Sequence, residues 1–228
     1  MEEIQNKYMK LPISIRLLKS ASMMQLYFLF LVGSSMAFFL GEFILELISM
    51  FKIDTPKPIP TSEKVIENSG FFWAFFGMII WSPIVEEFSF RYWLCYCRTK
   101  VVISLSAFTA LVFVWAFHFH SYWLYIFSNL VIFCLLYKIF NRVKYVIPLN
   151  TTMSNNSLIY LSAFVFSLLH LSNYDLAIHN WYLYVPYIIT QLFGGVFFGY
   201  LRVIRGFSYA LCIHSLGNLT SFTAAYFF

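Results

Sequence analysis

The chain has 228 residues, of which 61% are hydrophobic, 22% aromatic and only 11% charged. A soluble domain carries about 25% charged and about 45–50% apolar residues, so this composition argues against a soluble domain and is typical of a polytopic membrane protein. The net charge of +5 includes no Lys/Arg cluster on a soluble face, so we expect no binding to nucleic acid.

Apolar runs long enough to cross a bilayer core of about 30 Å follow one another along the chain. They cover approximately residues 22–51, 70–100, 101–118, 122–140, 157–174, 182–201 and 207–228. We therefore expect an all-α transmembrane helical bundle of seven helices. An eighth would arise if one of the two long runs at the N-terminal end were broken, and Ser82-Pro83 is the obvious place for a break in the second.

Most of the lysine and arginine residues lie at alternating connections between these runs. The positive-inside rule then predicts an N-terminus inside and a C-terminus outside. Arg202 and Arg205 are expected in the inner loop after the sixth run. We predict a single integral membrane domain over residues 1–228, in a bacterial cytoplasmic membrane.

The second run contains the stretch "WSPIVEEFSFRYW", residues 81–93. Ionisable residues inside a span are functional candidates by default. Glu87 and Arg91 are four residues apart, so they share a helix face and can pair. Glu86 is turned about 100° away from Glu87. We therefore expect Arg91 to neutralise the Glu87 carboxylate while Glu86 points in another direction.

Other polar side chains in the spans complete a candidate site. His214 and Asn218 present an imidazole and an amide on one helix face, and Phe166 lies one turn before His170. A carboxylate beside an imidazole can hold and deprotonate water, and an imidazole and an amide can stabilise an oxyanion. Two histidines and one glutamate also form a known zinc set, so Glu86, His170 and His214 are the candidate metal ligands. Both interpretations lead to hydrolysis inside a membrane.

Three short patterns occur in order in the chain: "EEFSFR" (86–91), "FSLLH" (166–170) and "HSLGN" (214–218). Together they resemble the CPBP family of membrane-embedded proteases, the type II CAAX-protease-like and bacteriocin-processing proteins once called Abi. The resemblance covers residues 83–100 and 157–220 as protease core helices. It leaves 101–150 as an inserted transmembrane hairpin.

The resemblance implies an intramembrane endopeptidase acting on membrane-associated proteins or peptides. Glu86 would activate a water held by His170, and His214 and Asn218 would stabilise the oxyanion. Three further residues of these patterns would support the site: Glu87, Arg91 and Phe166. The expected partners are membrane lipid and the substrate, and we favour a metal-independent reaction over one that uses zinc.

Two departures from the family pattern concern the site. Tyr92 follows Arg91 where the family often has glycine, and His118 or His120 lies nearer than His170 to the usual distance from the glutamates. We favour His170 because a phenylalanine stands four residues before it.

The predicted spans also carry a conflict of depth. They place Glu86 towards the inner half of the membrane and His170 towards the outer half, although the two must meet. A tilted second span broken at Pro83 would bring them together. Gly195-x-x-x-Gly199 is predicted to be a close-packing face.

Two functions of other classes fit the same residues. One is a non-catalytic immunity protein that binds a peptide toxin. The other is a proton-coupled transporter in which Glu86 and the histidines relay protons.

Overall fold

The computed structural model describes residues 18–51, 70–94, 98–116, 122–142, 155–174 and 183–227. Within these residues the fold is all-helical and contains no β-strand, which confirms the predicted class. The long helices are α3 (Met23–Met50), α7 (Arg98–Ala116), α8 (Tyr122–Arg142), α10 (Asn155–Leu169), α11 (Val185–Arg205) and α12 (Phe207–Phe227). The second span is a chain of short elements: α5 (Phe71–Phe75), η1 (Phe76–Trp81), α6 (Ser82–Glu86), η2 (Glu87–Arg91) and η3 (Tyr92–Leu94).

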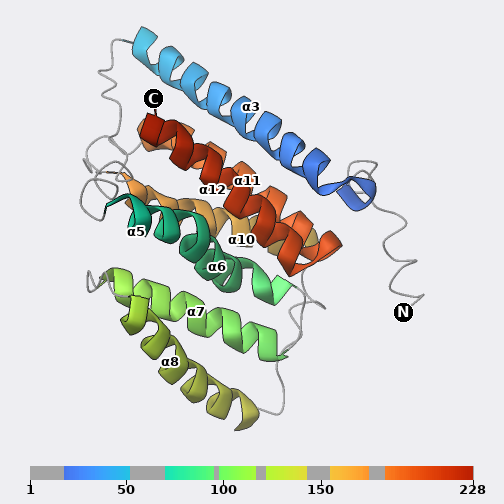
Figure 1. The fold of residues 1–228 in the computed structure, drawn as a ribbon, viewed down its shortest axis with the longest axis vertical. Coiled ribbons are helices and arrows are strands. Elements are labelled where there is room, and N and C mark those ends of the chain that lie inside the picture. The colour runs from blue at the N-terminus through green and yellow to red at the C-terminus, as the bar shows by residue number, and fades with distance from the viewer. Residues whose placement is uncertain are drawn as a thin grey trace.

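The helices lie side by side, with α3 at one edge of the molecule, α7 and α8 at the other, and the rest between them (Figure 1). Three helical stretches are long and apolar enough to cross a membrane: Met23–Met50, Phe71–Leu94 and Tyr187–Arg205. Two shorter apolar stretches, Thr99–Phe113 and Leu124–Ile139, form the hairpin of α7 and α8.

Both edge helices turn large apolar side chains outward. Phe39 of α3 and Phe127 of α8 are 69% and 65% exposed. Soluble proteins seldom expose such large apolar surfaces, whereas lipid tails receive them without cost. These faces are consistent with an integral membrane protein.

The start of α3 is fixed by its sequence. Ser22 Oγ accepts a hydrogen bond from the Gln25 backbone N–H at 3.2 Å, and Gln25 Oε1 accepts one from the Ser22 N–H at 2.8 Å. This reciprocal capping box satisfies two donors that every helix start leaves unpaired.

The central pair α10 and α11 packs unusually closely. A Cβ added at Gly195 would lie 2.9 Å from the Ala163 Cα, and one added at Gly199 would lie 2.8 Å from Ile159 Cγ2. Only glycine fits at either position, which confirms the Gly-x-x-x-Gly stretch as a packing face.

The helix over Phe71–Leu94 does not break at Ser82-Pro83. Instead, π-helical turns lie on both sides of α6, and the Ser82 N–H bonds to the Gly77 carbonyl five residues back. The next carbonyl in this pattern, that of Met78, would face Pro83, which has no N–H. π-turns accommodate the proline at the place where an eighth helix would have required a break.

Arg202 and Arg205 lie within the last turn of α11 and not in a loop, because the helix continues to Arg205. The alternative histidines, His118 and His120, lie outside the described residues.

Candidate functional site

The antiparallel packing of α10 against the Phe71–Leu94 helix brings the two halves of the site together. The ring centroids of Phe90 and Phe166 lie 5.3 Å apart, and Glu86 Oε2 lies 3.8 Å from His170 Nε2. Glu86 and His170 therefore meet, as the predicted site requires. The register of the two helices brings them together, because it sets Glu86 opposite His170 and, one turn along, Phe90 opposite Phe166.

Glu86 is the centre of the site. Ser82 Oγ, one turn earlier, donates a hydrogen bond to Glu86 Oε1. The other oxygen, Oε2, lies 3.4 Å from His214 Nε2 as well as 3.8 Å from His170 Nε2. The Glu86 side chain is 13% exposed, so it is sheltered without being sealed.

Glu87 is fully buried and pairs with Arg91, as their spacing predicts. Its Oε1 lies 2.5 Å from Arg91 Nη1 and 3.0 Å from His214 Nδ1. The His214 ring therefore stands between the two glutamates, one at each nitrogen. Sequence spacing had set Glu86 apart from Glu87; the structure links them through this shared imidazole.

Aromatic rings enclose the charged groups. The Arg91 guanidinium carbon lies 4.2 Å from the centre of the Phe166 ring, a cation–π contact. Phe166 also contacts the His170 ring, with a centroid separation of 4.1 Å. Phe198 of α11 stacks on His214 at 4.5 Å and 17°. The charges thus interact in surroundings of low polarity, which strengthens each electrostatic contact.

The hydrogen bonds fix the tautomer of His170. Its Nδ1 lies 2.9 Å from the Phe166 carbonyl oxygen. A carbonyl can only accept, so Nδ1 carries the hydrogen and Nε2 presents its lone pair. That lone pair faces Glu86.

His214 lies close to both glutamates. Nδ1 of His214 faces the Glu87 carboxylate and must therefore carry a hydrogen. Its Nε2 lies 3.4 Å from Glu86 Oε2, without a hydrogen bond between the two atoms. An imidazole beside a carboxylate can accept and return a proton.

Asn218 has a different partner from the other predicted residues. Its Nδ2 donates to the Met78 carbonyl at 2.8 Å, the carbonyl that Pro83 leaves without a backbone donor. An amide nitrogen carries two hydrogens, so one N–H of Asn218 remains for another acceptor.

The donor types of Glu86, His170 and His214 match zinc chemistry. Glu86 Oε2 is buried without a hydrogen-bond partner, which is also the state of a metal-ligand atom. In the described ranges, however, no three His, Cys, Asp or Glu side chains are arranged to hold a metal ion.

Two contributors were missed in the sequence. Ser82 lies four residues before Glu86, the spacing that had identified the Glu87–Arg91 pair, so the same rule would have found it. Phe198 carries no such signal, because only the packing of α11 against α12 brings it to His214.

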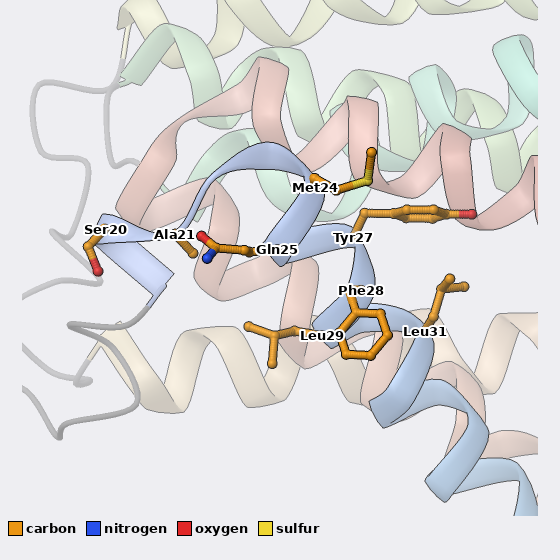
Figure 2. Close-up of a pocket in the computed structure, with 8 residues that line it drawn as sticks. All are labelled: Ser20, Ala21, Met24, Gln25, Tyr27, Phe28, Leu29 and Leu31. Atoms are coloured by element: carbon orange, nitrogen blue, oxygen red, sulfur yellow. The ribbon is translucent and has the colours of Figure 1, made fainter.

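A hollow of about 810 Å³ lies at the start of α3, well apart in sequence from the site (Figure 2). Its lining residues are Ser20, Ala21, Met24, Gln25, Tyr27, Phe28, Leu29 and Leu31. None of them carries a charge, and none belongs to the site around Glu86.

Comparison of the chain with protein-family models, with curated proteins and with solved structures finds no match.

Proposed function

We propose that the protein is an intramembrane endopeptidase of the CPBP type, with Glu86 as the general base. One observation carries the proposal. A carboxylate oxygen and two imidazole nitrogens, from three helices, converge within 3.4 and 3.8 Å in aromatic surroundings. The order of the three sequence patterns supports the same reaction class.

The first step is the activation of water. A water molecule that enters the site can donate one hydrogen to Glu86 Oε2 and the other to His170 Nε2. As its oxygen forms a bond to the peptide carbonyl carbon, Glu86 takes one proton and the carbonyl π electrons move to the oxygen.

The second step is collapse of the tetrahedral intermediate. The oxyanion receives hydrogen bonds from protonated His214 and from the second N–H of Asn218. The C–N bond then breaks, and the leaving nitrogen takes a proton from Glu86. Glu87 and Arg91 keep His214 oriented throughout, in the manner of the carboxylate that orients a catalytic histidine.

The membrane setting is part of the proposal. Seven spans, with the N-terminus inside a bacterial cytoplasmic membrane, would place the site within the bilayer. The hairpin of α7 and α8 would be an insertion between core helices. Substrates would be membrane-associated proteins or peptides.

The decisive test is Glu86→Gln in protein reconstituted into lipid vesicles with a library of membrane-anchored peptides. We expect the cleavage rate to fall by about 10²–10⁴-fold, the usual contribution of a general base. Glu46→Gln on the exposed face of α3 is the matched control. Equal cleavage by both variants would refute the proposal. Full wild-type activity in strong chelator would exclude the zinc version of the reaction.

The closeness of Glu86 to His170 and His214 also suits a proton-coupled transporter. That alternative predicts proton flux across vesicles that Glu86→Gln abolishes, with no peptide cleavage by the wild type. A toxin-binding immunity role would instead survive Glu86→Ala.

A further inference from the structure

The end of the helix that carries both glutamates leaves backbone carbonyls without regular partners. Beyond α6 the helix passes through the π-turn η2 and the 3₁₀-turn η3 and ends near Leu94. The last carbonyls of any helix lack intrahelical donors, and here the change from π- to 3₁₀-turns falls within residues 87–94. One of these carbonyls, that of Phe90, accepts a hydrogen bond from the Trp93 indole Nε1 at 2.7 Å. In an apolar membrane interior such groups need donors from the protein itself.

Two serines on neighbouring helices meet this need. Ser104 of α7 donates to the Phe88 carbonyl at 2.6 Å, and Ser162 of α10 donates to the Phe90 carbonyl. Both serines are buried, with 3% and 5% of their surface exposed.

An arginine on a third helix donates hydrogen bonds to two further carbonyls. Arg202 of α11 lies 3.3 Å from the Arg91 carbonyl through Nε and 3.4 Å from the Tyr92 carbonyl through Nη2. Its guanidinium carbon is 5.0 Å from the Tyr92 ring and 5.2 Å from the Phe207 ring. A planar guanidinium can reach both carbonyls at once, which an ammonium group cannot do in the same way.

These contacts differ from the usual behaviour of serines in helices. A helical serine commonly bonds to a carbonyl of its own helix. Ser106 and Ser167, also buried, do so with Ile103 and Phe164, and Ser106 Oγ has a second, longer contact of 3.4 Å with Asn129 Oδ1 of α8. Ser104 and Ser162 bond instead to backbone carbonyls of a neighbouring helix.

We infer that Ser104, Ser162 and Arg202 are positioning residues that hold the η2 turn in its π-helical register, so that Glu87 meets His214 and Glu86 faces both histidines. The inference depends on the proposed function only for its kinetic consequence. A return of η2 to α-helical pitch would rotate Glu87 relative to Glu86 and separate it from His214. Because three different helices supply the donors, α7 of the proposed insertion helps to set the geometry of the site.

The experiment compares Ser104→Ala and Ser162→Ala with the matched controls Ser106→Ala and Ser167→Ala, all in full-length protein in lipid vesicles. We expect kcat for peptide cleavage to fall by about two- to tenfold in each test variant, with KM unchanged. The controls should keep both constants. Arg202→Lys should lower kcat less than Arg202→Met does, because it keeps the charge and one donor.

The ¹⁵N signals of His214 give a readout that requires no turnover. We expect them to shift in the test variants, as the Glu87 contact lengthens, and to stay in place in the controls. Ser104→Thr and Ser162→Thr retain the hydroxyl and should restore the wild-type signals.

The outcomes separate the two proposals. The test variants could match their controls in both kcat and histidine signals while Glu86→Gln is inactive. That result would overturn the positioning role and leave the proposed protease function standing. A wild type that cleaves no peptide would overturn the proposed function, and the histidine signals alone would then decide the positioning role.

Discussion

The helix with the glutamates and the helix with the second histidine present their side chains in different ways. α12 is a regular α-helix over Phe207–Phe227, and its spacing alone puts His214 and Asn218 on one face. The Phe71–Leu94 helix alternates α-, π- and 3₁₀-turns, and side chains from neighbouring helices satisfy several of its carbonyls.

The two helices differ in what fixes the direction of their side chains. In a regular helix the backbone hydrogen bonds of the helix itself fix it, so one substitution leaves the geometry intact. An irregular helix at a functional site is held by its surroundings, and π-turns are frequent at such sites. Substitutions around the glutamate helix should therefore disturb the site more than equal changes along α12.

The largest loss of stability is expected from Arg91→Met. It leaves the fully buried Glu87 without its cation, and loss of one partner from a buried ion pair costs about 3–5 kcal/mol. Thermal unfolding in detergent measures the loss. Arg205→Met, at the half-buried end of α11, is the control, and an equal loss in both would contradict the role of the pair.

The second-largest loss of stability is expected from Asn218→Leu. This variant removes the side-chain donor to the Met78 carbonyl. A buried carbonyl left without a partner costs about 1–3 kcal/mol. Pro83→Ala restores a backbone N–H beside that carbonyl, so the substitution should cost less in the Pro83→Ala background. A double-mutant cycle on the free energy of unfolding measures this coupling. Strict additivity would show that the proline is not the reason for the Asn218 contact.

The smallest effect is expected from Ser82→Ala. The variant removes the hydrogen bond to Glu86 Oε1 but leaves the carboxylate in place. The Glu86 side chain is 13% exposed, so water can replace the lost hydroxyl and the net loss should be that of an ordinary hydrogen bond, about 0.5–1.5 kcal/mol. We expect kcat to fall by about two- to tenfold, with little change in unfolding temperature. Ser49→Ala, whose hydroxyl bonds to its own helix on α3, should behave like the wild type.

Several features of the site follow from local spacing, which is why they could be predicted. Glu87 and Arg91 pair because a separation of four residues places them on one face. The Gly195-x-x-x-Gly199 face packs closely because glycine alone permits that approach. The helical class follows from long apolar runs, since a bilayer interior requires internally bonded backbone.

Other features depend on packing between segments distant in sequence. The position of His214 between two carboxylates, the stacking of Phe198 on His214 and the contact of Glu86 with His170 join different helices. The meeting of Glu86 and His170 was hardest to foresee, because hydropathy does not reveal the register in which α10 packs against the Phe71–Leu94 helix.

The sequence by itself determined that the chain is helical and apolar enough for a membrane, and which few ionisable residues lie in its spans. Only the tertiary structure decided how those residues meet, and that the proline in the glutamate helix is absorbed by π-turns and not by a break. The physical reason is that hydropathy and spacing act within one helix. The bonding of a freed carbonyl and the sharing of an imidazole require atoms from another helix.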